Sequence, residues 1–482
     1  MTLLRNTFYN VAGSTVPIIV AIITVPFLLH GIGPAKFGLL SLAFLIVGYF
    51  GVFDLGLGRA IAHRIARIDD ADDVDPRPII GTAIVCNLAL GLTGGLVLWL
   101  FATLYFADFL DAEAALREQM IQAIPALVLS VPITALTGVL SGSLEGRGRF
   151  IAVNLASGFA AILFHLLPLS LVLSGTKDLQ WLVSAACAAR ILGVLILSVL
   201  CVREFGIRLA IIRSEAGRLF SFGGWVAVSS IVGPLMLVTD RFVIGALLGS
   251  IAVAIYTIPF EIAARTATIP QALGRALFPQ LSAERSGNLA SRLGYRSAFN
   301  LAALMTPLVI VGIFAMKPFL DLWLGTYDLK SVAIGQITLA AFWVNALSYV
   351  PLTFIVARGR PKTVAIVHCL EILPYFAVLY ALTKFWGVEG AALAFLLRCG
   401  VDYLLLGGLS KLLAQIWLSH SVFATLIIGA LFSAPYVQSN HFAALGLAAT
   451  FVIFAVLAAL ALDKQQSVEL YQKFAHRYKS SS

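Results

Sequence analysis

The sequence predicts an all-α polytopic membrane protein with about 14 transmembrane helices, in two six-helix pseudo-symmetric lobes plus a C-terminal helix pair. Three observations lead to this prediction: the composition, the succession of apolar segments and an internal repeat. Of 482 residues, 60% are hydrophobic and only 12% are charged, against roughly 25% charged in soluble domains. The mean hydropathy is +0.96. Such a chain belongs in a bilayer.

The apolar segments are each long enough to cross a membrane, which takes about 20 residues per helix. They lie at about 8–30, 37–58, 79–104, 120–141, 151–173, 180–201 and 220–246 in the first half. The second half has them at about 250–272, 297–316, 335–357, 364–384, 389–410, 421–437 and 442–462. The loops between them are short, so no room is left for a soluble catalytic domain. ATP-binding and common hydrolase motifs are absent as well, and no enzymatic activity or catalytic residue is expected.

An internal repeat relates the two halves. At an offset of 216 residues Gly33 falls on Gly249, and Leu57-Gly58-Arg59-Ala60 falls on Leu273-Gly274-Arg275-Ala276. Farther on, Arg147-Gly148-Arg149 matches Arg358-Gly359-Arg360, and Arg190 matches Arg398. A duplicated six-helix unit predicts an N-terminal lobe over 1–210, a C-terminal lobe over 211–412 and helices 13–14 with a tail over 413–482. Parallel repeats of this kind place a cavity between the lobes in transporters.

The basic residues predict the orientation. With the N-terminus inside, 23 of the 33 Lys and Arg residues fall on the cytoplasmic side and six outside, which is the usual asymmetry of membrane proteins. Both termini are therefore expected in the cytoplasm. The net charge of +9 reports this orientation and not nucleic acid binding. The segment from Cys201 to Phe220 resembles an interfacial helix, and the tail after Asp463 resembles a basic amphipathic surface stretch.

Four arginines fall inside predicted spans: Arg190, Arg241, Arg265 and Arg398. A charge facing lipid is costly, so these side chains must face protein or water. A guanidinium in a wet cavity suits a diphosphate, because its planar fork can donate two parallel hydrogen bonds. We therefore take the four as candidate cavity residues for substrate binding. The alternative is that they pair with neighbouring acids and fix the helix packing.

Intramembrane acids accompany three of these arginines. Glu261 precedes Arg265 by four residues, Asp402 follows Arg398 by four, and Asp240 adjoins Arg241. The hairpin that turns near residue 386 brings Glu371 level with Asp402, so two acids flank Arg398. The corresponding hairpin of the first lobe places His165, and no acid, level with Arg190. We treat Glu371, Asp402, Asp240 and Glu261 as candidate ion-coupling residues for H⁺ or Na⁺, with charge pairing as the alternative. No metal site and no other cofactor is expected.

Short stretches along nearly the whole chain resemble the polysaccharide transporters, or O-antigen flippases, of the multidrug/oligosaccharidyl-lipid/polysaccharide (MOP) exporter superfamily. They are Asn10 with Gly13, Gly33-Pro34-Ala35-Lys36-Phe37-Gly38, Asp54-Leu55-Gly56-Leu57, Asp240-Arg241-Phe242-Val243-Ile244-Gly245 and Val253-Ala254-Ile255-Tyr256. The resemblance implies a bacterial inner-membrane protein that moves an undecaprenyl-diphosphate-linked oligosaccharide to the periplasmic leaflet by alternating access. It also makes Arg265 similar to a cavity arginine of lipid II flippases. Those proteins carry further cavity arginines in their first two helices, which this chain lacks at mid-depth.

Three functions are compatible with these features. A flippase for lipid-linked sugars predicts cationic groups in the cavity, a drug/cation antiporter of the same fold predicts acids, and a membrane polysaccharide polymerase predicts a large periplasmic loop. The four arginines favour the flippase. Its partners would be the lipid-linked oligosaccharide, membrane lipids, a polysaccharide polymerase and a chain-length regulator.

Overall fold

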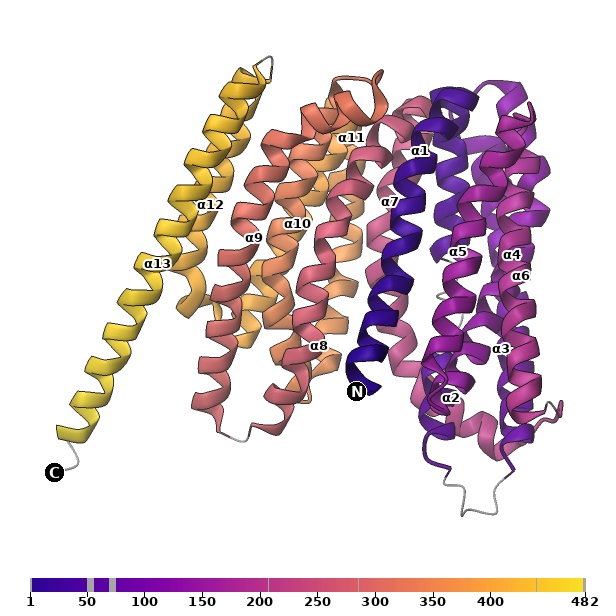
Figure 1. Ribbon diagram of the computed structural model, residues 1–482, viewed down its shortest axis with the longest axis horizontal. Coiled ribbons are helices and arrows are strands. Elements are labelled where there is room, and N and C mark those ends of the chain that lie inside the picture. Colours follow the sequence, from indigo (N-terminus) through magenta and orange to yellow (C-terminus); the bar gives the residue numbers. More distant parts are fainter. Residues whose placement is uncertain are drawn as a thin grey trace. The chain divides into compact units, whose positions relative to one another are not determined.

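The computed structural model describes residues 2–49, 56–68, 75–206, 208–284, 286–438 and 440–479, and their regular elements are all helical (Figure 1). Eleven of these helices are long and apolar enough to cross a membrane. Three of the eleven contain a glycine with non-helical backbone angles: Gly33, Gly249 and Gly387. Counting the helical arms on either side of each glycine separately gives fourteen segments in the described chain, which agrees with the predicted number.

Glycine is required at these breaks. Gly33 has φ 80° and ψ 163°, and Gly249 has φ 83° and ψ 177°. This region of backbone space is essentially restricted to glycine, because a Cβ atom would clash there. The two glycines are the pair matched by the 216-residue offset. The second matched pair behaves in the same way, since Gly148 and Gly359 both have φ 75°. The repeat is therefore confirmed at the level of backbone conformation.

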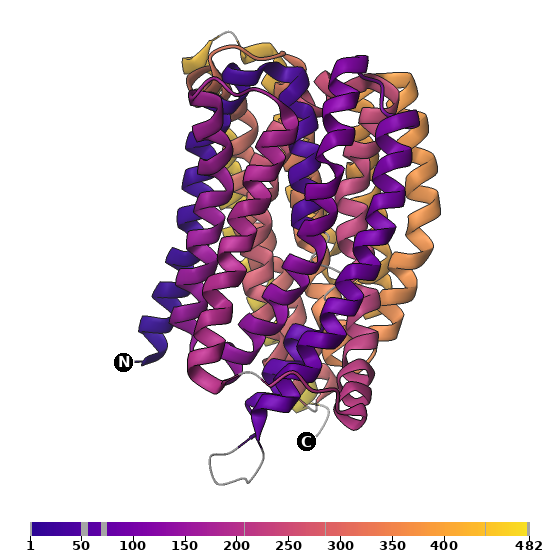
Figure 2. The same ribbon diagram turned by 90° about the vertical axis from the view of Figure 1, so that its right-hand side faces the viewer.

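The chain divides into two compact units, Met1–Ala254 and Ile255–Ser482. The helices of the first unit are α1 (Thr2–Tyr49), α2 (Leu57–Ile65), α3 (Pro76–Leu104), η2 (Tyr105–Phe109), α4 (Ala114–Gly146), α5 (Phe150–Leu173), α6 (Leu179–Phe205) and most of α7 (Arg213–Ala264). Helix α4 is central and packs against α2, α3 and α6, while α5 packs against α6 and α1. Figure 2 looks onto this unit and shows its long helices side by side. Ile61, Ile80 and Val139 belong to its buried core.

The second unit is built around α10 (Lys330–Ala357). Its other elements are η3 (Arg265–Ala267), α8 (Thr268–Ala283), α9 (Gly287–Leu324), α11 (Pro361–Ser410), α12 (Leu413–Val437) and α13 (His441–Lys479). Helix α10 packs against α8, α9 and α11, and α9 also contacts α12 and α13. Phe260, Phe342 and Phe395 form an aromatic cluster with ring centroids 5.2–5.3 Å apart. Helices α4 and α10 are repeat equivalents, and each is the central helix of its unit.

The first unit includes the first arm of α7. The Tyr105 hydroxyl donates a 2.8 Å hydrogen bond to the Phe242 carbonyl, and the Asp111 amide donates one of 3.2 Å to the Gly245 carbonyl. A Cβ added to Gly38 would lie only 1.9 Å from the Ser250 carbonyl oxygen. The compact unit thus extends to residue 254. The lobe boundary at 210, which concerns the repeat and not the contacts, stays a prediction.

The expected interfacial helix between the lobes is wrong for the part that the structure describes. Helix α6 ends at Phe205, residues 208–212 are irregular, and α7 starts directly at Arg213. The backbone of this segment is bound by α3 instead. The Thr82 hydroxyl donates to the Ala210 carbonyl at 2.9 Å and accepts from the Ile212 amide at 3.0 Å. The side chains of the predicted amphipathic tail after Asp463 lie outside the described residues.

Candidate functional site

A cluster of buried charges joins the two arms of α11. The arms meet at Gly387, which has φ 64° and confirms the hairpin turn predicted near residue 386. Arg398 Nε lies 3.7 Å from Glu371 Oε2 on the opposite arm. His368 Nε2 lies 3.3 Å from Asp402 Oδ1, again across the hairpin. We call these four side chains, His368, Glu371, Arg398 and Asp402, the α11 cluster.

The α11 cluster is withdrawn from solvent. Glu371 is 6% exposed, Asp402 3% and Arg398 9%. Both carboxylate oxygens of Glu371 lack a hydrogen-bond partner among the described residues, and so do Asp402 Oδ1 and Arg398 Nε. Buried polar atoms are normally hydrogen-bonded. The carboxylates of the cluster therefore have acceptor capacity left over.

The prediction for this cluster was partly right. Glu371 contacts Arg398 as expected, and Asp402 also acts electrostatically on Arg398, so two acids flank the arginine as predicted. The side chain nearest to the Asp402 carboxylate is that of His368, at 3.3 Å. The sequence reasoning missed His368. It lies one helical turn before Glu371, on the same face, so extending the comparison of the two arms by one turn would have found it.

Arg190 lies in a setting without acids. Its guanidinium carbon is 5.0 Å from the centroid of the Phe164 ring, a cation–π distance. Phe164 in turn packs edge-on against His165, with centroids 5.4 Å apart, and against Phe44 at 4.6 Å. Among the described residues, no carboxylate lies within ion-pair distance of Arg190, as the sequence predicted. It is half-buried, and its buried Nε has no hydrogen-bond partner among the described residues.

Arg265 lies where the helix is interrupted. It begins the three-residue 3₁₀ turn η3, between the end of α7 and the start of α8. Its guanidinium is 3.6 Å from Glu261 Oε2, and the two side chains are 50% and 41% exposed. The expected i, i+4 pair is therefore confirmed. An exposed pair of this kind is weak, so Arg265 can exchange Glu261 for another anion.

Asp240 and Arg241 form a closed pair within the first unit. They are 0% and 1% exposed, and Arg241 Nη1 lies 3.0 Å from Asp240 Oδ1. The same guanidinium nitrogen also donates to the Leu237 carbonyl. Both side chains are thus sealed among protein atoms. A bound molecule could reach Arg241 only after a rearrangement.

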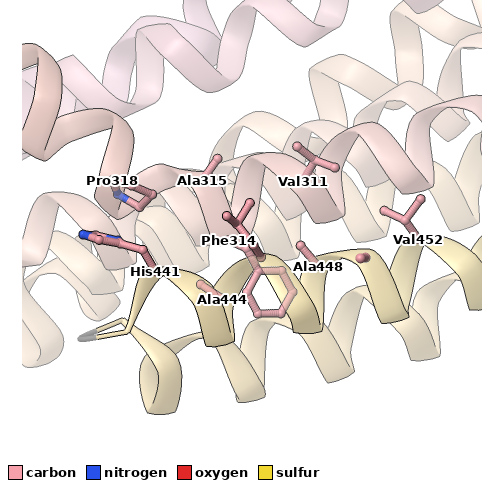
Figure 3. Close-up of a pocket in the computed structure, with 10 residues that line it drawn as sticks. Val311, Phe314, Ala315, Pro318, His441, Ala444, Ala448 and Val452 are labelled. Atoms are coloured by element: carbon pink, nitrogen blue, oxygen red, sulfur yellow. The ribbon is translucent and has the colours of Figure 1, made fainter.

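An apolar pocket lies apart from these charges, between α9 and α13 (Figure 3). Its volume is about 390 Å³. It is lined by Val311, Phe314, Ala315, Pro318, His441, Ala444, Leu445, Ala448, Ala449 and Val452. None of the candidate site residues contributes to it. His441 at one end is its only titratable lining group.

Comparison with solved structures identifies the class of fold. The lipid II flippase MurJ in an inward closed conformation aligns over 97% of this chain and 100% of its own, with a TM-score of 0.69 and 13% identity. An inward-facing multidrug resistance MATE family transporter of the MOP superfamily aligns over 84% of this chain and 99% of its own, with a TM-score of 0.69 and 14% identity. The fold is that of MOP superfamily transporters.

The sequence comparisons identify the family. The family described as "Polysaccharide biosynthesis protein" matches residues 3–283, more than half of the chain. A "Putative O-antigen transporter" of Shigella flexneri is 30% identical over 84% of this chain and 97% of its own length. A "Probable flippase AglR" of Haloferax volcanii is 23% identical over 78% of this chain and 76% of its own. The chain belongs to the polysaccharide biosynthesis protein family, and these two relatives are named as a transporter and a flippase.

Proposed function

We propose that this protein is a flippase that moves an undecaprenyl-diphosphate-linked oligosaccharide from the cytoplasmic to the periplasmic leaflet. The observation that carries the proposal is the 30% identity with a "Putative O-antigen transporter" over nearly its whole length. The internal repeat supports it, because parallel repeats are common in transporters that work by alternating access. O-antigen or exopolysaccharide repeat units are the proposed cargo, and a polysaccharide polymerase and a chain-length regulator are the proposed partners.

Arg190 and Arg265 are the proposed contacts for the diphosphate. Neither is held in a buried ion pair: Arg190 faces an aromatic ring, and Arg265 has an exposed acid as its partner. Phosphate oxygens would form stronger, bidentate hydrogen bonds with these guanidinium groups. Arg241 and Arg398 are buried beside carboxylates. We therefore propose that they stabilise helix packing and do not bind the cargo directly.

The experiment that tests the proposal is deletion of the gene in a strain without redundant flippases. We expect lipid-linked oligosaccharide to accumulate on the cytoplasmic leaflet and the surface polysaccharide to disappear. Re-expression of the protein should restore it. Surface polysaccharide that persists in the deletion strain would contradict the proposal.

A drug/cation antiporter is the second candidate function. It is favoured by the buried acids of the α11 cluster and by the fold shared with MATE transporters. The same deletion strain separates the two candidates. An antiporter predicts normal surface polysaccharide together with increased sensitivity to cationic dyes.

We further propose a location in the bacterial inner membrane with both termini in the cytoplasm. Fourteen crossings would return the chain to the side where it began, and the asymmetry of Lys and Arg supports the cytoplasm as that side. Single cysteines placed in the exposed turns at Ser286 and Lys177, on a background without the five native cysteines, test the location. An impermeant reagent in the periplasm should label position 177 and leave position 286 unlabelled, and the reverse pattern would overturn the proposed orientation.

A further inference from the structure

We propose that the α11 cluster is a proton-binding site in which Glu371 takes up the proton. Proton binding stands on the geometry of the cluster alone. Its use in transport rests on the proposed function, so the two are tested separately below.

The charges of the cluster do not balance without a proton. Arg398 supplies one positive charge, Glu371 and Asp402 supply two negative ones, and the His368 imidazole carries no charge unless it takes up a proton. All three charged groups are more than nine-tenths buried. A buried charge without compensation is strongly unfavourable. One proton removes the excess negative charge.

Glu371 is the acceptor that the contacts favour. Both of its oxygens lack a hydrogen-bond partner among the described residues, although the side chain is only 6% exposed. Asp402, by contrast, has the His368 imidazole within 3.3 Å. Desolvation opposes the charged form of a carboxyl group, and the ion-pair partner of Glu371 is Arg398, with Nε 3.7 Å away.

The site fits a proton better than Na⁺. The arms of α11 on both sides of Gly387 are helical, so most of their backbone carbonyls already accept a hydrogen bond; the Leu370 carbonyl is an exception, because Pro374 has no N–H to donate to it. The guanidinium of Arg398 and the imidazole of His368 occupy the space beside the carboxylates and would repel or exclude a second cation. No group of three or more His, Cys, Asp or Glu residues in the described chain is arranged to hold a metal ion.

The surrounding groups do not supply the missing charge. Tyr375 and Cys399 of α11 act on Arg398, and Tyr349 of α10 is influenced by Arg398 and Asp402. Arg275 of α8 carries a positive charge, but it acts on Tyr349 and not on Glu371 or Arg398. Tyrosine and cysteine ordinarily titrate well above neutral pH. His420 of α12 is bound to the hydroxyl of Tyr403 at 2.8 Å, outside the cluster.

Protonation would change the partner of Arg398. With Glu371 charged, Arg398 forms an ion pair across the hairpin, between the two arms of α11. When Glu371 takes up a proton, Asp402 is the remaining carboxylate, and it lies on the arm of Arg398 at the i, i+4 spacing that favours an ion pair. The proton thus replaces a contact between the arms with one within a single arm, which loosens the hairpin.

Infrared spectroscopy of the purified full-length protein in lipid tests proton binding. We expect wild-type protein to show the C=O stretch of a protonated carboxyl group as the pH is lowered through the neutral range. Difference titration should give about one proton more per chain than in Glu371→Gln. Asp328→Asn, which changes an exposed loop acid of the same unit, is the matched control and should titrate like wild type. His368→Gln should keep the band, because it leaves Glu371 in place.

Several results would overturn the proposal. One is a carboxyl C=O band that persists in Glu371→Gln, whether or not it is lost in His368→Gln. Another is a titration midpoint that moves when Na⁺ replaces K⁺ at constant ionic strength. Glu371→Gln keeps the size of the side chain, and a single symmetric peak in size-exclusion chromatography verifies its folding. If that variant does not fold, Glu371→Asp and His368→Gln decide instead: a band that shifts in frequency in Glu371→Asp and is unchanged in His368→Gln supports the proposal, and a band unchanged in Glu371→Asp overturns it.

Transport in vesicles with an imposed pH gradient tests the use of the proton. We expect the gradient to accelerate lipid-linked oligosaccharide transport by wild type and Asp328→Asn, but not by Glu371→Gln. If transport by wild type does not depend on the pH gradient while the carboxyl band is present, coupling is contradicted and proton binding stays supported. A protein that binds the proton but transports no lipid-linked oligosaccharide would contradict the proposed function.

Discussion

Arg64 and Glu215 are 151 residues apart in the sequence and form a two-pronged ion pair. Arg64 Nε and Nη2 each donate a 3.1 Å hydrogen bond to a different carboxylate oxygen of Glu215. Glu215 is only 6% exposed, and its hydrogen bonds raise the pKa of the Arg64 guanidinium above the usual value. The pair links the first turn of α7 to α2, next to residues 208–212, whose backbone is hydrogen-bonded to Thr82.

Replacing Arg64 should therefore destabilise the protein. Hydrogen bonds to charged groups contribute about 1.5–3 kcal/mol, and Arg64→Ala would also leave Glu215 buried without this partner. We expect a clear fall in the melting temperature of the purified protein, and a smaller fall for Arg64→Lys, which keeps the charge but not the fork. Arg59→Ala, at an exposed position of the same helix, is the control. Equal melting temperatures for Arg64→Ala and Arg59→Ala would argue against the pair.

The broken helices predict unequal effects of alanine at equivalent glycines. Alanine at Gly33 or Gly249 must adopt a backbone conformation that costs about 1–3 kcal/mol. At Gly249 the new Cβ would also lie 2.9 Å from the Asp111 carbonyl oxygen, whereas nothing lies within 4 Å of the site at Gly33. The melting temperature of Gly249→Ala should therefore be lower than that of Gly33→Ala. Gly400→Ala, in open space within a regular helix, should be neutral or slightly stabilising, and an equal loss in all three variants would contradict this reasoning.

The Asp240 and Arg241 pair should behave as a structural unit. Removing one member of a buried ion pair costs about 3–5 kcal/mol, because the other charge is left uncompensated. We expect Arg241→Met to lower the amount of folded protein strongly, and Asp240→Asn combined with Arg241→Met to recover much of it. Size-exclusion chromatography after extraction measures both. A double variant no better than Arg241→Met would show that the pair is not what stabilises this position.

The proposed cargo contacts should affect transport without affecting folding. Arg190→Ala and Arg265→Ala are expected to reduce flipping of lipid-linked oligosaccharide in reconstituted vesicles by at least tenfold, which corresponds to about 1.4 kcal/mol. Arg190→Lys and Arg265→Lys should retain intermediate activity, since the charge remains but the bidentate geometry is lost. Melting temperatures should stay near that of wild type. Full activity of both alanine variants would remove these residues from the mechanism.

The features predictable from the sequence were those that recur along it. Composition and segment length indicated the helical membrane fold, and the repeat paired Gly33 with Gly249, where both helices break. The helix pairing around Gly387 placed Glu371 opposite Arg398. Each of these depends on spacing, which a single sequence contains.

The features that were missed depend on side-chain direction and on contacts between distant segments. His368 was missed because its contact with Asp402 crosses the α11 hairpin and depends on the direction of the two side chains. Residues 208–212 have apolar and basic residues typical of a surface helix, but hydrogen bonds with Thr82 hold them irregular. The Arg64 and Glu215 pair left no signal in the sequence, since the two residues are 151 positions apart and no motif or periodic spacing links them.

The packing of residues 235–254 within the first unit has a consequence for biosynthesis. A nascent chain of 210 residues has the whole first repeat, but the Phe242 carbonyl that accepts from Tyr105 and the Gly245 carbonyl that accepts from Asp111 have not yet been made. At about 5–20 residues per second, the ribosome needs roughly 2 to 7 s more to add them. During that interval the first unit lacks the part of α7 that contains Phe242 and Gly245. The first unit therefore matures only after synthesis of the second repeat has begun.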